Sequence, residues 1–331
     1  TWRMSYPIMR EIYNMDQDFS PAPDNPVIVI GGAGVDLIGR LEAELLPGTK
    51  NPANIRTSYG GVARNVAENL SRLGQSTILL TAIGDDQAGK QLLAQAVQAG
   101  VDISHVLTTS DHPTGTYLGI LNTQGTLQFA LDDINATQSL TPEYIESHAE
   151  LFKGASSVFI DANLPKATIR KIFSKARQAR IPVCADPAST GLAPRLKPFI
   201  PRLSLITPNG EEAGILCDQI IENNQPQDAM EAAKCLVAKG VNIVLVSLGE
   251  FGVVYATSET SGYVPAIRTA VIDPTGAGDA LNAAVLYALL NQIPLDDAVR
   301  LGVTAASLTL RHRGTVVDHL SLELLYDHLV I

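Results

Sequence analysis

The sequence predicts an α/β protein built on a doubly wound parallel sheet, with a small β-sheet added to it. Short β-branched runs alternate with helical patterns from Val27 onward, which is typical of parallel strands joined by crossover helices. One hairpin interrupts this alternation. With 331 residues, of which 46% are hydrophobic and 18% charged, the chain is long enough for one large domain or two smaller ones and too apolar to be disordered.

The predicted strands are short apolar runs. They lie at residues 27–30, 77–83, 157–161, 182–185, 203–207 and 243–247. The predicted helices have apolar residues at helical spacing. They lie at residues 62–73, 88–99, 167–179, 227–239, 277–290 and 295–310. Because the two kinds of element alternate, we expect helices on both faces of the sheet.

The predicted hairpin consists of residues 116–121 and 126–131, with the turn Asn122-Thr123-Gln124-Gly125 between them. No helix separates these two strands, so we expect them to pair directly. Together with the segment after Asp36, they predict a small sheet that projects from the main one and covers a cleft.

These patterns also predict the domain boundaries. Residues 1–26 end in a turn-rich run and are expected to form an N-terminal arm. Residues 27–331 are expected to form one domain, in which the segments near 36–58 and 114–133 serve as a lid.

The charge and cysteine content exclude several classes of partner. A net charge of -10 repels phosphate backbones, and no dense Lys/Arg run offsets it, so we expect no nucleic acid. The three cysteines form no C-x-x-C pair, which favours free thiols in a reducing, cytoplasmic setting. No apolar run is long enough to span a bilayer, so we expect no membrane partner.

Two glycine-rich segments resemble nucleotide motifs but fail at one position each. In the run Gly31-Gly32-Ala33-Gly34-Val35-Asp36-Leu37, Leu37 stands where a dinucleotide fingerprint has its third glycine. A turn with Asp36 facing a cleft is the better interpretation. In Gly84-Asp85-Asp86-Gln87-Ala88-Gly89-Lys90-Gln91, Gln91 replaces the Ser or Thr that binds Mg²⁺ in a P-loop, and a helix start is favoured.

The strongest chemical signal is Asp273-Pro274-Thr275-Gly276-Ala277-Gly278-Asp279, which precedes an apolar helical pattern. An ordinary helix-capping turn also uses Asp and Gly, but two glycines, a threonine and two aspartates within seven residues are more specific. Backbone amides of Gly276, Ala277 and Gly278 at a helix start are suited to stabilising an anion. Asp279 is then placed to accept a proton from an attacking hydroxyl, as phosphoryl transfer requires.

Three motifs together resemble the signatures of the ribokinase (PfkB) family of carbohydrate and nucleoside kinases, over nearly all of the chain from Val27. They are Gly60-Gly61-Val62-Ala63-Arg64-Asn65-Val66-Ala67, Ala82-Ile83-Gly84-Asp85-Asp86-Gln87-Ala88-Gly89 and the segment that ends at Asp279. The resemblance implies the ribokinase-like fold with a β-sheet lid, ATP as the phosphoryl donor, and Mg²⁺. The predicted hairpin has exposed edges, which readily pair, so we expect a homodimer formed through the lid.

The resemblance also implies where ATP and metal ions bind. Asn209-Gly210-Glu211-Glu212 matches the family's N-x-x-E element, which implies that Asn209 and Glu212 organise Mg²⁺ through water. Ser247-Leu248-Gly249-Glu250-Phe251-Gly252 resembles the nucleotide loop. The ATP contacts so implied come from Ser247, Gly249, Gly252 and Thr275. A monovalent cation such as K⁺ is implied near Asp273, although Pro274 lacks the backbone donor of the commoner Thr or Ser.

On the acceptor side, the resemblance implies that Asp36, Gly61 and Asn65 hold sugar hydroxyls. A helix-cap role for Asn65 is about equally compatible with its position alone. Three further polar residues lie in segments that resemble the family members acting on pseudouridine, and are assigned to the nucleoside base: Asp133, Asn135 and Asn163. Each of these could equally cap a turn.

These observations predict an enzyme that transfers phosphate from ATP to a ribosyl 5′-hydroxyl, with pseudouridine as the first candidate acceptor. A ribokinase or another sugar or nucleoside kinase is the alternative within the family. A binding protein that kept the fold and lost activity is disfavoured, because Asp279, Gly276 and Asn209 are all present.

Overall fold

The computed structural model describes residues 24–219, 221 and 225–329. The predicted arm of residues 1–26 falls almost wholly outside the described residues.

The main sheet has eight strands in the order β14-β13-β12-β11-β10-β9-β1-β4. Six of them are parallel: β1 Val27–Ile30, β4 Thr77–Leu80, β9 Ser157–Asp161, β10 Val183–Asp186, β11 Leu205–Ile206 and β12 Ile243–Ser247. The antiparallel edge strands are β13 Val253–Ala256 and β14 Ser261–Val264. A strand of this sheet lies at each predicted position, although the prediction at residues 77–83 extended too far, and the antiparallel edge pair was not predicted.

One predicted strand, at residues 77–83, is in fact two. The chain leaves β4 at Leu80 and forms β5, Ala82–Gly84, which pairs with β6, Leu107–Thr109, in a separate two-stranded sheet. A run of apolar residues indicates burial but does not indicate to which sheet each residue belongs. Because residues 77–83 are one apolar run, they were predicted as a single strand.

The six predicted helices are confirmed to within one residue at each end. They are α2 Val62–Arg72, α3 Gln87–Gln98, α5 Lys166–Ala179, α7 Pro226–Ala238, α8 Ala277–Leu290 and α9 Leu295–Leu310. Three shorter helices were not predicted: α4 Pro142–Ser147, α6 Gly210–Cys217 and α10 Leu322–Asp327. None of the described helices is long and apolar enough to cross a membrane.

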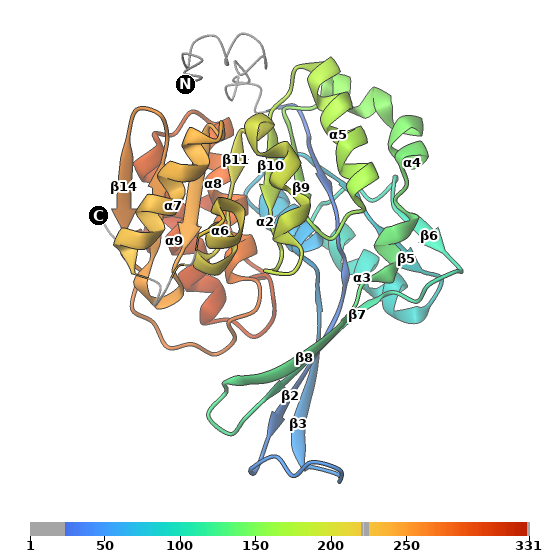
Figure 1. Ribbon diagram of the computed structural model, residues 1–331. Helices are drawn as coiled ribbons and strands as arrows, with labels where there is room; N and C mark the ends of the chain where they lie inside the picture. The colour runs from blue at the N-terminus through green and yellow to red at the C-terminus, as the bar shows by residue number, and fades with distance from the viewer. Residues whose placement is uncertain (1–23, 220, 222–224, 330–331) are drawn as a thin grey trace.

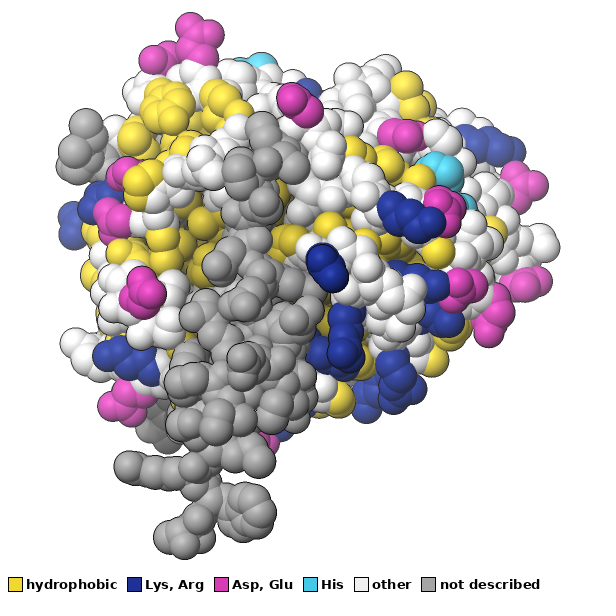
Figure 2. Space-filling view, turned by 90° about the horizontal axis from the view of Figure 1, so that it is seen from above, with side chains coloured by type: hydrophobic (Ala, Val, Ile, Leu, Met, Phe, Trp, Pro, Cys, Tyr) yellow, Lys and Arg dark blue, Asp and Glu magenta, His cyan; other side chains and the backbone are white. Residues whose placement is uncertain are grey.

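Helices cover both faces of the main sheet (Figure 1). Alternate residues of β1 enter opposite cores: Ile28 packs with residues of α5, α6 and α7, and Val29 packs with residues of α2, α8 and α9. This alternation follows from the two-residue period of a strand, and it gives the sheet two buried faces. On the face opposite the projecting sheet, basic side chains gather over the half that contains α4 and α5 (Figure 2).

A second sheet of four strands, in the order β3-β2-β7-β8, projects from the main body (Figure 1). Its strands are β2 Gly34–Leu41, β3 Ala53–Gly60, β7 Gly115–Leu121 and β8 Leu127–Asp133. We call it the projecting sheet. The hairpin prediction is confirmed, because β7 and β8 pair directly around a turn in which Asn122 Oδ1 accepts hydrogen bonds from two backbone amides.

The register of the projecting sheet sorts its side chains onto two faces. Ser58, Asp36, Tyr117 and Asp132 stand opposite one another across the four strands, so they share what we call the inner face. The outer face carries six large apolar residues: Leu37, Ile55, Leu118, Ile120, Phe129 and Leu131.

Candidate active site

The segment of residues 273–279 leads into α8, which begins at Ala277. Asp279 lies in the first turn of this helix and is 8% exposed. The first N–H groups of a helix have no partner within it, and the helix dipole places partial positive charge at the same end. The start of α8 is therefore suited to stabilise a negatively charged group.

Two glycines shape this helix start for different reasons. Gly276 has φ +83°, and a Cβ atom on it would lie 2.0 Å from the carbonyl oxygen of Thr315, so only glycine fits. At Gly278 a Cβ atom would meet nothing within 4 Å. Gly278 lines a pocket of about 190 Å³, and its backbone is thus open to a ligand.

The Asp279 carboxyl is adapted to exchange a proton near neutral pH. Burial is the main reason that its pKa rises to about 8, and the neighbouring carboxylates of Asp186, Asp161 and Asp36 raise it further. A hydrogen bond from Asn65 Nδ2 to Asp279 Oδ2, at 2.7 Å, acts in the opposite direction. A general base works best when its pKa lies near the working pH.

Asn65 is itself held in place by Arg64. The Arg64 guanidinium donates to Asn65 Oδ1 at 3.1 Å and to the carbonyl oxygen of Tyr59 at 2.7 Å. Because the amide oxygen of Asn65 accepts from Arg64, its NH₂ group is the end that faces Asp279. Both side chains are buried in α2.

Asp36 projects from β2, close enough to Asp279 for its charge to raise the pKa of Asp279. Burial raises its pKa to about 7, while the Arg64 guanidinium lowers it. A Cβ atom on Gly60 would lie 2.0 Å from Asp36 Oδ2, and one on Gly61, where φ is +94°, would lie 2.5 Å from the carbonyl oxygen of Gly32. Gly60 therefore leaves room for the Asp36 carboxylate, and Gly61 lets the start of α2 approach the backbone that follows β1.

Asp161 closes the crevice at the carboxyl end of β9. Its side chain accepts hydrogen bonds from the backbone amides of Gly32, Ala63 and Asn163, at 2.8, 3.1 and 2.9 Å. Burial raises its pKa to about 6, although the hydrogen bonds from Gly32 and Asn163 oppose the shift. Asp161 therefore joins the end of β1, the start of α2 and the loop after β9, and it fixes where Asn163 stands.

The pocket in front of Gly278 is lined by residues of other strands and helices, and Asp36 is not among them. Asp186, at the end of β10, accepts from Asn282 Nδ2 and from the amide of Ala188, both at 2.6 Å, and burial raises its pKa. The polar residues lining this pocket are Asp186, Thr207, Asn209, Glu212, Ser247, Asp279 and Asn282.

Asn209 and Glu212 form a capping box at the start of α6. Asn209 Oδ1 accepts from the Glu212 amide, and Glu212 Oε2 accepts from the Asn209 amide, each at 2.9 Å. Burial, and next the charge of Asp186, raise the pKa of Glu212 to about 7. The box fixes both side chains at the pocket wall.

The fold and this acidic, glycine-lined crevice were compared with known proteins. The family model described as pfkB family carbohydrate kinase matches residues 24–320. The chain belongs to the PfkB family. It is 32% identical to pseudouridine kinase of Escherichia coli over 285 residues, covering 86% of this chain and 90% of that protein.

Two other relatives extend the comparison. Guanosine-inosine kinase of Exiguobacterium acetylicum is 29% identical over 285 residues, covering 86% of this chain and 93% of that protein. The structure of Arabidopsis thaliana ribokinase complexed with ribose and ATP superposes with a TM-score of 0.78 and 25% identity, covering 93% of this chain and 99% of that one. The chain therefore has the ribokinase-like fold and is a sugar or nucleoside kinase.

In this PfkB kinase, the structure brings some of the sequence-predicted ATP contacts together and leaves others apart. Asn209, Glu212 and Ser247 line the pocket with Asp279. Neither Gly249 nor Gly252 is among its lining residues. A Cβ atom on Gly252 would lie 2.2 Å from the carbonyl oxygen of Val264, so this glycine is needed for the approach of β14.

Of the residues predicted to contact the nucleoside base, two form a local turn with each other. Asn135 Nδ2 donates to Asp133 Oδ1 at 2.8 Å, so these two residues form a local turn. The register places Asp132, not Asp133, on the inner face with Asp36, and the charge of Asp132 contributes to the raised pKa of Asp36. A one-residue difference decides which carboxylate faces the crevice.

Two residues of this PfkB kinase site were missed by sequence reasoning. Asp186 ends β10 as Asp161 ends the adjacent β9, and the carboxyl ends of parallel strands meet at one crevice, so its position was a usable signal. Asn282 lies three residues after Asp279 on α8, a spacing that places both on one side of a helix.

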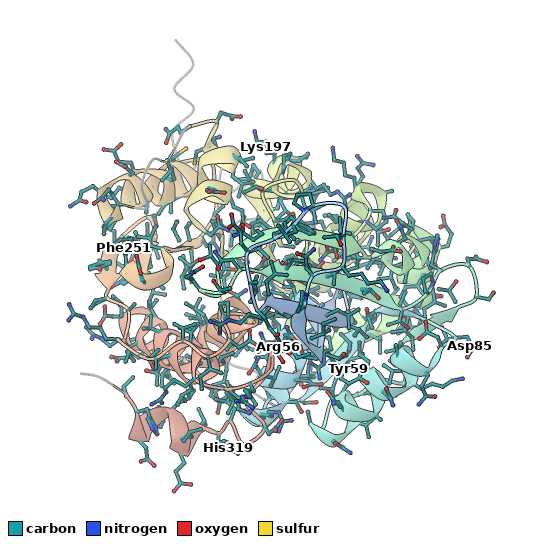
Figure 3. All side chains as sticks on the ribbon, turned by 90° about the horizontal axis from the view of Figure 1, so that it is seen from below. Arg56, Tyr59, Asp85, Lys197, Phe251 and His319 are labelled. Carbon is teal, nitrogen blue, oxygen red and sulfur yellow. The ribbon has the colours of Figure 1, made fainter. Side chains whose placement is uncertain are left out.

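The side chain of Asp273, near which the family resemblance implies a monovalent cation, forms an ion pair with an arginine. Its carboxylate lies 2.7 Å from the Arg56 guanidinium and also accepts from the Thr275 amide at 3.0 Å. Arg56 extends from β3, and it lies near the centre of the molecule when this is seen from the side of the projecting sheet (Figure 3). A protein side chain therefore forms an ion pair with Asp273, and a monovalent cation near this residue stays a prediction.

Proposed function

We propose that this kinase transfers the γ-phosphate of ATP to the 5′-hydroxyl of a ribosyl group, and that pseudouridine is its acceptor. One observation carries the reaction: Asp279 is buried in the first turn of α8, beside the accessible backbone of Gly278 and 2.7 Å from Asn65. The donor assignment is also supported by the likeness to a ribokinase structure that contains ribose and ATP.

In the proposed step, the acceptor oxygen attacks the γ-phosphorus while its proton passes to the Asp279 carboxylate. The bond from the γ-phosphorus to the bridging oxygen breaks, and ADP leaves with that oxygen. The amides at the start of α8 stabilise the negative charge on the transferring group. Asp36 holds the sugar by accepting from its hydroxyls.

Mg²⁺ fits a group of oxygen ligands that line the same pocket. Among the described residues, no group of three or more His, Cys, Asp or Glu side chains is placed to bind a metal without help. Mg²⁺ commonly keeps several waters and takes one or two carboxylates together with substrate phosphates, and the oxygen ligands present are Asp186, Asn209 and Glu212. When bound, the ion would neutralise charge on the phosphate oxygens.

The acceptor assignment rests on polar groups beyond those that a sugar needs. Asp132 on the inner face and Asn163, in the loop after β9 and beside Gly32, can both contact a base attached to the sugar held by Asp36. Among the relatives, the E. coli and Exiguobacterium kinases are named for nucleosides. Pseudouridine has one more ring N–H than uridine, and a carboxylate or amide oxygen can accept from it.

We expect kcat/KM for pseudouridine to exceed that for uridine by about ten- to a hundredfold, because one unpaired buried partner costs ~1–3 kcal/mol. We expect kcat/KM for free ribose to be lower than that for uridine. The measurement is ATP consumption with each acceptor at equal low concentration.

Asp132→Ala and Asn163→Ala should each reduce the ratio of kcat/KM for pseudouridine to kcat/KM for uridine. KM for ATP should change little. Asp133→Ala is the matched control, since this neighbouring carboxylate faces the other way. Faster turnover of ribose or fructose than of pseudouridine would replace the nucleoside assignment by that of a general sugar kinase.

We also propose that two copies of the chain pair through the outer faces of their projecting sheets. Ile55, Phe129 and Leu131 on this face are 72%, 46% and 62% exposed, and no described element of the same chain covers them. A surface that is complementary to its own copy generates a closed twofold dimer, and contiguous apolar surface commonly marks such an interface.

Light scattering of the wild-type protein should give the mass of a dimer, and Phe129→Glu should shift it to that of a monomer, because a charge would be buried at the interface. Tyr326→Glu, at an exposed aromatic residue of α10, is the control and should remain dimeric. A wild-type monomer at assay concentration contradicts the proposal.

A further inference from the structure

A second cavity, of about 580 Å³, lies among α2, α3, the base of β3 and the segment that follows α9. Its volume is within the range of small-ligand sites. α2 contributes Arg64, Glu68 and Arg72 at four-residue spacing, which places them on one side of the helix. Most other lining residues are polar, so the cavity is suited to a small hydrophilic ligand.

The charges around this cavity do not balance. Glu68 forms an ion pair with Arg64, and the Asp318 carboxylate lies 4.0 Å from the Arg72 guanidinium, which also donates to the Asp318 backbone carbonyl oxygen. The third guanidinium, of Arg313, has no ion pair among the described residues. In a chain with a net charge of -10, a cavity with three arginines and two acids is a local region of positive charge.

Some hydrogen-bond donors of the residues that line this cavity also have no acceptor. Within the described part of the chain, the buried guanidinium nitrogens Arg64 Nε and Arg72 Nε have no hydrogen-bond partner, and Arg64 is only 3% exposed. A buried donor without an acceptor is costly. Guanidinium groups have the planar donor geometry that matches the oxygens of a phosphate.

We propose that this cavity binds a small anion carrying a phosphoryl group, either inorganic phosphate or a phosphate monoester, and that binding is transmitted to Asp279. Arg64 is the link. Its guanidinium borders the cavity on one side and donates to Asn65 Oδ1 on the other, and Asn65 donates to Asp279.

A second route runs through Thr315, which also lines the cavity. Its hydroxyl donates to the carbonyl oxygen of Tyr59 at 2.6 Å and accepts from Arg64 at 3.3 Å, while its own carbonyl oxygen lies against Gly276. An anion that draws Arg64 toward the cavity therefore changes contacts at β3, at the helix start of α8 and at Asn65 together.

The binding claim is independent of the proposed reaction, whereas the transmission to Asp279 rests on it. Calorimetric titration with inorganic phosphate and, separately, with ribose 5-phosphate distinguishes the two sources of the anion. A saturating non-hydrolysable ATP analogue is present throughout, so that the pocket near Gly278 is filled. Binding of either ligand supports the site if Arg313→Gln weakens it, and the tighter of the ligands so affected identifies the source.

Arg313→Gln should weaken this binding about tenfold or more, because it removes the unpaired cation. Lys153→Gln, which removes the same charge from an exposed position, should leave it unchanged. No binding to the wild-type protein, or equal binding to Arg313→Gln, overturns the site.

Transmission is tested by kinetics at saturating ATP. The anion should change kcat/KM for the acceptor in the wild-type enzyme and have no such effect in Arg313→Gln, whose basal activity should be normal. Binding that leaves the kinetics of the wild-type enzyme unchanged overturns the link through Arg64. A protein that binds phosphate but phosphorylates no acceptor instead contradicts the proposed function and leaves the site standing.

Discussion

Replacing Asp279 by Asn should lower kcat by at least ~10²-fold, the low end for a positioned proton acceptor, and should leave ATP binding nearly intact. The amide oxygen of the new side chain can still accept from Asn65, so the local geometry is retained. Steady-state kinetics with the acceptor and equilibrium binding of ATP separate these two effects. Turnover within a few-fold of wild type would remove Asp279 from the role of base.

The same substitution should stabilise the protein, in a way that depends on pH. The pKa of Asp279 rises from 3.8 to about 8 on folding. Between these values the folded state keeps a proton that the unfolded state has released, so wild-type stability falls as pH rises through this window. An amide has no such proton. Tm of Asp279→Asn should therefore exceed that of wild type at pH 8, with a smaller difference at pH 5.

Glu259→Gln is a suitable control for this measurement, because Glu259 is exposed and its replacement should not alter Tm in a pH-dependent way. A difference in Tm between Asp279→Asn and wild type that is constant from pH 5 to pH 8 would contradict the assigned environment of Asp279. A gain in stability on losing a catalytic group is a common result of the conflict between function and stability.

Gly278→Val should reduce kcat/KM for ATP by about 10²–10³-fold, the loss expected when one donor to a developing anion is blocked. A Cβ atom at this position meets no neighbour within 4 Å, so the folded protein can accept the side chain. The side chain would instead fill the space in front of the first amides of α8. Thermal unfolding should show little change in Tm.

Gly276→Ala is the informative comparison. Its Cβ atom would lie 2.0 Å from the carbonyl oxygen of Thr315, at a φ of +83°, so this smaller substitution should lower Tm as well as activity. If Gly278→Val retains normal kcat/KM, the amides at the start of α8 do not stabilise the transferring phosphate.

Much of the local structure could be predicted from the sequence because it depends on neighbouring residues. Apolar spacing gave the six long helices, and the Asn122 turn gave the hairpin, since both signals act over a few residues. The separate sheet of β5 and β6 could not be found in this way. Its pairing depends on residues more than twenty positions apart, and an apolar run carries no information about its partner.

The same distinction between local and long-range interactions applies to the candidate site. By itself, the sequence determined which residues open α8, with the two glycines and the aspartate that the proposed chemistry needs, because these lie within four consecutive positions. Only the tertiary structure decided that Asp132 rather than Asp133 faces Asp36, that Arg64 orients Asn65 toward Asp279, and that Arg56 neutralises Asp273. Strand register and contacts between distant segments fix these relations, and both arise only when the sheets and helices pack together.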